Sequence, residues 1–166
     1  MPVSNITIRK ATTEDISVIQ RLAHATWPYT FKEILSAEQI KYMLELIYSK
    51  TSLKKQLAEG HNFLIAEEND TPIAYADYSL LKDDIYKLHK IYVLPQQQGK
   101  GIGKLLIEYI IDAIKKSNAA TLLLNVNRYN EAKAMYERLG FKVIGEEDID
   151  IGEGFFMNDF IMEKKL

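Results

Sequence analysis

The sequence predicts an α/β (α+β) protein with a mixed, mostly antiparallel central sheet of about seven strands and helices on both of its faces. Apolar residues recur at helical spacing before residue 60, and strand-like alternation dominates after it. Two more helix-like segments then interrupt the strands. The expected order of elements is therefore β-α-α-β-β-β-α-β-α-β-β.

The part of the chain before residue 60 is expected to hold one short strand and two amphipathic helices. Residues 6–12 alternate like a strand, and residues 14–27 carry apolar side chains at helical spacing. Ser36 is a suitable N-cap for the second helix, because its hydroxyl can accept a hydrogen bond from the first turn. A shorter helical piece covers residues 52–58 and ends near Gly60.

Strand patterns dominate the next segment. Residues 61–68 and 73–81 are expected to pair as a hairpin around the turn "NDTP". Residues 85–94 alternate strictly, as a strand with two different faces does. This alternation predicts one face formed by Tyr86, Leu88, Lys90 and Tyr92, and an opposite face formed by Lys87, His89, Ile91 and Val93.

The remaining segments are expected to form two helices and three strands. Residues 104–117 are strongly periodic, and the apolar run 120–126 is typical of a strand buried on both faces. Asn130 is a suitable N-cap for a helix over residues 131–139, which stops at a glycine. The rest of the chain is expected to be a last hairpin.

Composition and charge exclude several classes of protein. With 166 residues, 47% hydrophobic and 27% charged, the chain is expected to form one globular domain over residues 1–166. The net charge of -2 gives no basic footprint for nucleic acid. The sequence has no cysteine, which excludes thiolate metal sites and cysteine nucleophiles, and no metal site is expected. Neither a leader nor a long apolar run is visible, so we expect a cytoplasmic protein without membrane association.

The stretch "VLPQQQGKGIGKLL", residues 93–106, places three glycines between a predicted strand and a predicted helix. A helix N-terminus carries unpaired N–H groups and partial positive charge, and glycine lets the backbone approach an anion closely. Two familiar phosphate motifs do not fit. A P-loop would need glycine at Gln98 and a hydroxyl at Leu105, and a dinucleotide fingerprint lacks its third glycine.

The pattern Gln98-x-x-Gly101-x-Gly103 resembles the acetyl-CoA-binding signature of the GCN5-related N-acetyltransferase (GNAT) superfamily. A second stretch, "NEAKAMYERLGF" at residues 130–141, is similar to the later motif of that superfamily, in which an asparagine precedes Ala-x-x-x-Tyr-x-x-x-Gly-Phe. Both motifs occur in the right order with a predicted strand between them. The resemblance implies the GNAT fold, N-acetyltransferase activity and acetyl-CoA as the cofactor.

The resemblance also implies which residues hold the cofactor. The pyrophosphate of CoA would bind backbone N–H groups of the glycine loop, formed by Gln98, Gly99, Lys100, Gly101, Ile102, Gly103 and Lys104. The pantetheine arm would run beside Ile91 and Val93, where two central strands splay apart. Asn130 would hydrogen-bond to the cofactor, or would only cap its helix.

Tyr136 would contact CoA and act as the general acid. A phenol with a pKa of about 10 can donate a proton to a departing thiolate of similar basicity. The alternative is a tyrosine that only packs on an amphipathic helix. The implied mechanism is direct attack of a neutral amine on the acetyl thioester, with a backbone N–H near Val93 stabilising the oxyanion.

The identity of the general base is open. Some members of the superfamily carry a glutamate where this chain has Lys87, and a lysine is not an ordinary base. His89 shares the predicted strand face and has a suitable pKa, so it is the first candidate. Asp77 is the alternative, and ordered water could replace a dedicated base.

The acceptor pocket is expected at the junction "ATWPYTFKEIL" between the first two helices, which form the acceptor wall in this superfamily. We expect a loop there, since proline is a poor core element and loops carry binding residues. The pocket would be lined by Trp27, Tyr29, Phe31, Asp77 and Tyr78, with Phe155 or Phe156 in addition. Alternatively, the aromatic side chains belong to the core.

The Trp-x-x-Thr-Phe junction and the ending "FFMNDFIMEK" resemble the PaiA-like group of spermidine/spermine acetyltransferases. The expected partner is a small-molecule amine such as a polyamine, with no nucleic acid and no membrane, and a homodimer is a further expectation. Two other functions stay open. A protein or peptide N-acetyltransferase differs only in its acceptor, and a non-catalytic acyl-CoA sensor would keep the loop. Lys87 favours the sensor, and Tyr136 favours the enzyme.

Overall fold

The computed structural model describes residues 5–166 and confirms the predicted mixed sheet flanked by helices. Within this range, no helix has the length and apolarity that crossing a bilayer demands. Single 3₁₀ turns lie at Thr13–Asp15 and Pro95–Gln97. The helices and strands are, in chain order, β1 (Ile6–Lys10), α1 (Ile16–Phe31), α2 (Ala37–Tyr48), α3 (Lys50–Ala58), β2 (Asn62–Glu68), β3 (Thr71–Lys82), β4 (Ile85–Val93), α4 (Ile102–Lys115), β5 (Thr121–Asn127), α5 (Ala132–Arg138), β6 (Lys142–Gly152) and β7 (Phe155–Lys165).

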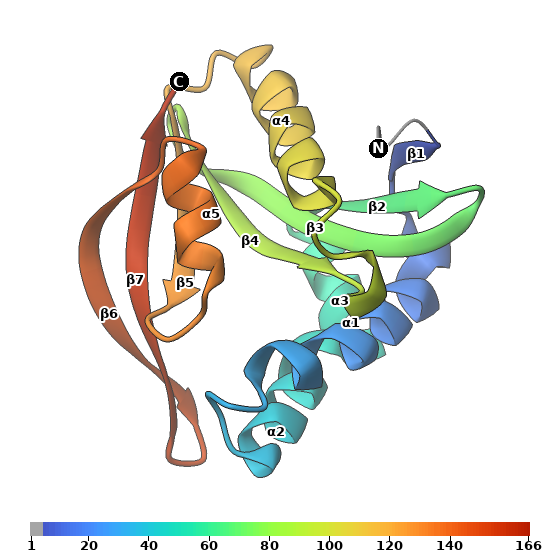
Figure 1. Cartoon of the computed structure of the whole chain (residues 1–166), viewed down its shortest axis with the longest axis vertical. Coiled ribbons are helices and arrows are strands. Elements are labelled where there is room, and N and C mark those ends of the chain that lie inside the picture. The colour runs from blue at the N-terminus through green and yellow to red at the C-terminus, as the bar shows by residue number, and fades with distance from the viewer. Residues whose placement is uncertain (1–4) are drawn as a thin grey trace.

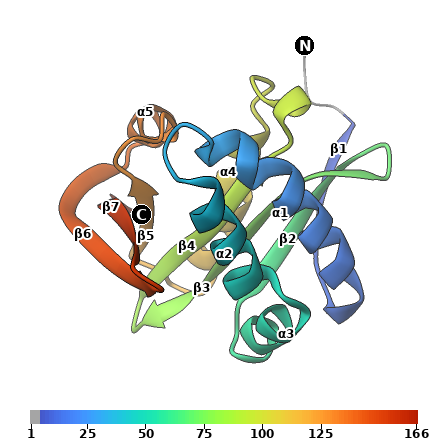
Figure 2. The same cartoon turned by 90° about the horizontal axis from the view of Figure 1, so that it is seen from below.

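The sheet has seven strands in the order β1-β2-β3-β4-β5-β7-β6. All neighbouring strands are antiparallel except β4 and β5, which are parallel. Helices α1, α2 and α3 cover one face, and α4 and α5 lie on the other (Figures 1 and 2). We call these the α1–α3 face and the α4–α5 face. The parallel pair stands in the middle of the sheet, where both faces are covered.

The two central strands pair over only part of their length. Their ladder joins Ile85–Leu88 to Thr121–Leu124 and then stops. Beyond Leu88 the strands diverge, and in Figure 1 the β5–β7–β6 half of the sheet swings away from the β1–β4 half. The divergence leaves two strand edges facing each other, which we call the split. Edges of this kind carry unpaired backbone groups that must find other partners.

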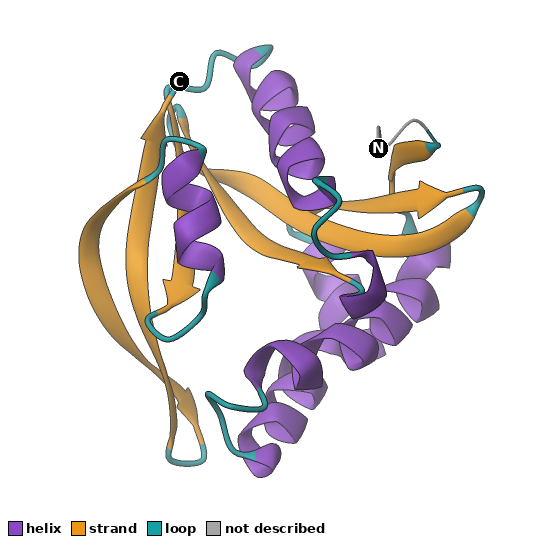
Figure 3. Ribbon diagram, in the orientation of Figure 1, coloured by secondary structure: helices purple, strands orange, loops and turns teal. Residues whose placement is uncertain are grey.

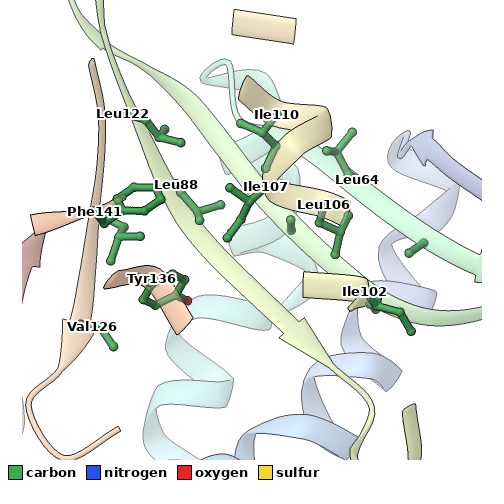
Figure 4. Packing of buried hydrophobic residues seen from close by; sticks show 14 of the residues in the cluster. Leu64, Leu88, Ile102, Leu106, Ile107, Ile110, Leu122, Val126, Tyr136 and Phe141 are labelled. Atoms are coloured by element: carbon green, nitrogen blue, oxygen red, sulfur yellow. The ribbon is translucent and has the colours of Figure 1, made fainter. Parts of the chain in front are cut away.

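Two apolar clusters hold the helices to the sheet. The cluster on the α4–α5 face is drawn in Figure 4 and includes Leu64, Leu88, Ile102, Leu106, Ile107, Ile110, Leu122, Val126, Tyr136 and Phe141. The cluster on the α1–α3 face includes Ile19, Leu22, Trp27, Phe31, Met43, Tyr48, Leu53, Phe63, Ile65 and Tyr75. Helix α4 is positioned by its periodic apolar stripe, so the loop before it has a rigid support.

The expected loop at the α1–α2 junction is wrong. Helix α1 continues through Pro28 and ends at Phe31, four residues beyond the expected end at Trp27. A proline inside a helix removes one backbone hydrogen bond and usually ends the helix. Here Trp27 and Phe31 are 3% and 2% exposed, and their burial against the sheet holds the last turn in place. The aromatic residues of this junction therefore belong largely to the core.

The strict alternation expected for β4 is also wrong. Asp77 pairs with Lys90 and Tyr78 pairs with Leu88, so His89 is an extra residue in a β-bulge. Because of this extra residue, the side chains before and after His89 do not follow one continuous alternation between the two faces of the sheet. Leu88, Ile91 and Val93 pack on the α4–α5 face, whereas Lys90 and Tyr92 face α1 and α3.

Candidate active site

The glycine loop leads from the end of β4 into the first turn of α4 (Figure 3). Gly101 is the N-cap and has φ of 79°, in the left-handed region that favours glycine. No side chain caps this helix. The first-turn N–H groups of Ile102, Gly103 and Lys104 therefore point out of the helix without an intrahelical acceptor, beside the positive end of the helix dipole. This backbone geometry is suited to an anion, and the binding of one here stays a prediction.

The charged side chains of the loop lie close to this site. Lys100 donates to Gln97 Oε1 at 2.9 Å, and Lys104 lies 3.8 Å from Glu108. Gln98 donates from its side chain to the carbonyl of Val93 at 3.2 Å, which ties the loop to the end of β4. The loop can therefore offer several N–H donors and two ammonium groups to one anionic ligand.

The backbone of β4 directs hydrogen-bonding groups into the split, and of these the carbonyl of Val93 already accepts from the Gln98 side chain. Leu94 N donates to Ile73 O at 2.9 Å, so Leu94 is in a hydrogen-bonded pair with β3. Such pairs alternate along an antiparallel ladder, which turns the N–H and C=O groups of Ile91 and Val93 away from β3. The edge that they form suits an extended ligand with amide groups. The place of the pantetheine arm there, which the family resemblance implies, stays a prediction.

The opposite edge of the split, which β5 forms, also presents backbone N–H groups. Arg128 N donates to Asn158 O at 2.9 Å, which fixes the alternation of the β5–β7 ladder. The N–H groups of Asn125 and Asn127 then point from β5 toward β4. Sequence reasoning missed both asparagines, because no pattern in the chain shows where the two strands part.

Tyr136 lies on α5, packs against Phe141 with 5.9 Å between ring centroids, and is 7% exposed. Figure 4 shows its hydroxyl oxygen directed from α5 toward β4, at the split. Burial raises the pKa of Tyr136 well above 10, so the hydroxyl keeps its proton. Asn130 Oδ1 accepts a hydrogen bond from Ala132 N at 2.9 Å and thus stabilises the start of the helix. Helix α5 begins one residue later than predicted, with Glu131 in place of Asn130 as its N-cap. Neither the hydrogen bond of Asn130 nor the packing of Tyr136 excludes contact with a ligand.

His89 occupies the bulge directly after the last residue of β4 that pairs with β5. Burial lowers the pKa of His89 to about 4, so the ring is neutral at neutral pH. Its Nε2 lies 2.7 Å from Ser79 Oγ, and its ring lies 4.4 Å from the ring of His61. A neutral imidazole can accept a proton, but this nitrogen already has a partner. The role of His89 as a base therefore stays a prediction.

Asp77 belongs to a buried polar cluster that the sequence did not reveal. Its Oδ2 accepts hydrogen bonds from His61 Nδ1 at 2.6 Å and Lys90 Nζ at 2.7 Å, and Lys90 also donates to Gln56 of α3. Burial raises the pKa of Asp77, but the hydrogen bond from His61 and the charge of Lys90 outweigh it, and the pKa lies below 3.8. Because Asp77 is 0% exposed, the structure does not bring it to an acceptor pocket.

The expected aromatic pocket is only partly assembled. Tyr92 of β4 packs against both Trp27 and Phe31, with ring centroids 5.7 and 6.3 Å away. Tyr29 lies apart from them on the surface of α1, 50% exposed beside Lys32. Tyr78 packs with the cluster on the α4–α5 face, so it lies across the sheet from Trp27. The expectation that Tyr29 and Tyr78 line one pocket with Trp27 is therefore not met.

The tip of the β6–β7 hairpin reaches α2 (Figure 1). Tyr42 of α2 donates to the carbonyl of Ile151 at 2.7 Å, and Gln39 donates to the carbonyl of Phe156 at 2.7 Å. Tyr42 also packs on Phe155 with 5.4 Å between ring centroids. The hairpin and α2 together therefore cover one side of the α1–α3 face next to the split.

Asp159 on β7 is a further residue that sequence reasoning missed. It is 5% exposed, and Asn125 donates to its Oδ2 at 3.3 Å. A signal was present in the sequence: at strand spacing Asp159 stands between Met157 and Ile161, where a carboxylate is out of place. Among residues 5–166, no group of three His, Cys, Asp or Glu side chains could hold a metal ion.

Comparisons with known proteins agree with this geometry. The family model described as "Acetyltransferase (GNAT) domain" matches residues 31–159. The chain is similar to a spermidine N(1)-acetyltransferase of Thermoplasma acidophilum, with 30% identity over 97% of this chain and 98% of the relative. It is also similar to a [ribosomal protein bS18]-alanine N-acetyltransferase of Haemophilus influenzae, with 30% identity over 76% of this chain and 81% of the relative.

A solved structure gives the same result. The crystal structure of the PaiA N-acetyltransferase from Thermoplasma acidophilum in complex with coenzyme A superposes with a TM-score of 0.82 and 30% identity, covering 97% of this chain and 99% of that one. The glycine loop at α4, the split and the comparisons all lead to one assignment. The chain belongs to the GNAT family of acetyl-CoA-dependent N-acetyltransferases.

Proposed function

We propose that this acetyltransferase acts on a primary amine of a small molecule of the polyamine class, by direct attack in a ternary complex. The observation that carries the proposal is the cover formed by the β6–β7 hairpin on α2. Two hydrogen bonds of 2.7 Å hold the hairpin against α2 beside the split. In this proposal the acceptor enters past this cover, which a slender, flexible amine does more easily than a folded protein surface. The full-length similarity to a spermidine N(1)-acetyltransferase supports the same class.

Residues on both sides of the split have defined roles in this proposal. Acetyl-CoA supplies an activated acetyl thioester, and the loop from Gln98 to Lys104 would hold its pyrophosphate. The N–H of Val93 faces the split and would donate a hydrogen bond to the thioester carbonyl. The hydroxyl of Tyr136 would give its proton to the leaving sulfur. No covalent enzyme intermediate is needed.

A second candidate acceptor is a protein N-terminus. It is supported by the 30% identity to the ribosomal-protein acetyltransferase, although that match covers less of this chain than the spermidine enzyme does. The two candidates differ in what must pass the β6–β7 hairpin, because the amine of a protein N-terminus is bonded to a Cα that carries a side chain and the rest of the polypeptide. The choice can therefore be tested with substrates of different width.

Thiol release from acetyl-CoA should be fastest with linear polyamines. The assay compares spermidine, spermine and putrescine with peptides that carry a free N-terminus or a lysine, and mass spectrometry locates the acetyl group. We expect kcat/KM for the best polyamine to exceed that for every peptide. Faster turnover of a peptide would replace the polyamine with a protein acceptor. Tight CoA binding without turnover of any amine would instead indicate a sensor.

Gly101→Ala should weaken CoA binding by about tenfold, equivalent to about 1.4 kcal/mol. A Cβ at φ of 79° is strained by roughly 1–2 kcal/mol, and it would alter the backbone that presents the N–H groups. Gly60→Ala is a matched control, because Gly60 has φ of 95°, an equally open surrounding and a place far from the loop. Calorimetry should show that both variants lose stability and that only Gly101→Ala loses CoA affinity. Equal CoA affinity in the two variants would contradict the role of the loop.

A further inference from the structure

The orientation of Asp159 follows from the alternation of β7. Phe160 lies under Lys133 of α5, with the ammonium 5.2 Å from the ring, so Phe160 faces α5. Its neighbour Asp159 must then face the opposite side, toward α1 and α2. Met157, two residues earlier, packs with the cluster on that face. Asp159 therefore lies on the side of the split that Tyr136 does not occupy.

Asp159 is an incompletely satisfied buried carboxylate. Its Oδ2 accepts one long hydrogen bond from Asn125, and its Oδ1 is buried without any hydrogen-bond partner in the described structure. Burial of a carboxylate is costly unless charge and hydrogen bonds compensate it. Asp77 Oδ1 is also buried without a partner, but the other oxygen of Asp77 binds His61 and Lys90, whereas Asp159 has no cationic partner in the described structure. A bound ligand is one source of the donor that Asp159 lacks. An ammonium group is the donor that supplies both a hydrogen bond and an opposite charge.

Among the residues that the structure describes, no cation forms an ion pair with Asp159. Burial raises the pKa of Asp159, the hydrogen bond from Asn125 opposes the shift, and the charge of Glu147 on β6 adds to it. Lys87 of β4 and Arg128 after β5 lower this pKa from a distance, and neither forms an ion pair with Asp159. Arg128 is instead bound to Glu146 and Asp148 on the other side of β6.

Asp159 is also close to the reacting centre. Asp159 is the partner of Asn127 in the β5–β7 ladder, and the N–H of Asn127 faces the split. Burial is the main cause of the raised pKa of Tyr92, and the charge of Asp159 adds to it. Tyr92 belongs to the part of β4 that borders the split. A ligand on Asp159 would therefore approach the split from the α1–α3 face, opposite the hydroxyl of Tyr136.

We propose that Asp159 binds the reacting ammonium group of the acceptor and takes its proton. The proposal rests on the proposed function, because it needs a small-molecule amine in the same site. Asn125 orients the carboxylate through Oδ2, and Oδ1 is left for the amine. In this proposal Asp159 is the base, a role for which His89 is the candidate from the sequence and has its Nε2 already paired with Ser79.

The proton balance of the step is simple. The ammonium gives one proton to Asp159, and its nitrogen forms a bond to the thioester carbon as the carbon–sulfur bond breaks. The leaving sulfur takes the proton of Tyr136, and the second proton lost by the nitrogen restores Tyr136. Asp159 then releases its proton to solvent, so one proton leaves the enzyme for each amide that forms.

Asp159→Asn should lower kcat/KM for the best amine by roughly 30-fold or more, because the amine loses its buried charge partner. Affinity of the CoA-loaded protein for that amine, measured by calorimetry, should fall at least tenfold. The acid limb of the kcat/KM–pH profile should also flatten, because it reports the protonation of Asp159 beside Glu147, Lys87, Arg128 and Tyr92. The melting temperature should stay the same or rise.

Asp148→Asn is the matched control, since it removes an exposed carboxylate of β6 that pairs with Arg128 outside the site. Its kinetics should equal those of the parent. The inference is overturned if the parent is active and Asp159→Asn retains its turnover, amine affinity and pH profile. If the parent neither binds nor acetylates any amine, both the inference and the proposed function fail.

Discussion

Tyr136→Phe is expected to lower kcat with the best amine by ~10²–10⁴, the range that general acids contribute. The hydroxyl points at the split, and its loss leaves the departing thiolate without a proton donor. The aromatic ring that packs against Phe141 stays, so the fold should be unaffected. Stopped-flow detection of free thiol under saturating acetyl-CoA measures kcat directly.

The control for this variant is Tyr129→Phe, which removes a hydroxyl that is 75% exposed from the loop before α5. It should leave kcat unchanged. CoA affinity should be nearly equal in the two variants and the parent, because the loop at α4 carries most of that binding. If Tyr136→Phe turned over as fast as the parent, Tyr136 would be a packing residue and the proton would come from water.

The pH dependence gives the same assignment a second test. Burial raises the pKa of Tyr136 above its ordinary value of 10, which favours the protonated phenol in the folded protein. The acid form required for donation is therefore present throughout the neutral and mildly alkaline range. We expect no loss of kcat from ionisation of Tyr136 below about pH 10. An alkaline limb near pH 8 that disappears in Tyr136→Phe would contradict this.

Much of the fold could be predicted because local patterns and packing agree. Ser36 accepts a hydrogen bond from Gln39 N at 3.1 Å, as expected of an N-cap. The periodic apolar positions of α4, such as Leu106 and Ile110, are buried as predicted. The glycine loop was recognisable because its backbone geometry requires particular residues at Gly99 and Gly101. Each of these features depends on neighbours in the sequence.

The features that escaped prediction depend on contacts between distant segments. Pro28 stays helical only because Trp27 and Phe31 are buried against strands far along the chain. The bulge at His89 is defined by its pairing with β3, and it moved Lys90 to the face of Asp77. A period of two cannot reveal where one residue is added to a strand.

Asp77→Asn is expected to destabilise the fold by about 3–5 kcal/mol, the cost of leaving one member of a buried ion pair alone. Lys90 has a side chain that is 11% exposed, and its ammonium would lose the carboxylate at 2.7 Å. His61 would lose the same partner. Urea unfolding at pH 7 measures the change in the free energy of unfolding.

Two controls separate the ion pair from generic damage. Glu108→Gln disrupts the exposed pair with Lys104 and should cost less than about 1 kcal/mol. The double variant Asp77→Leu/Lys90→Met removes both charges and should recover most of the stability, because replacing a whole buried pair by apolar side chains is often neutral. A cost below about 1 kcal/mol for Asp77→Asn alone would show that Lys90 reaches solvent.

The pH dependence of stability follows from the same group. Because the folded-state pKa of Asp77 lies below the unfolded value of 3.8, its contribution is fully present above pH 3.8 and is lost as the pH falls through the folded value. The parent should therefore lose stability in acid more steeply than the double variant does. Between pH 6 and pH 8 the free energies of unfolding of the two proteins should change in parallel, because Asp77 of the parent is then ionised in both the folded and unfolded states. Parallel acid curves for the two proteins would mean that Asp77 carries no net stabilising charge.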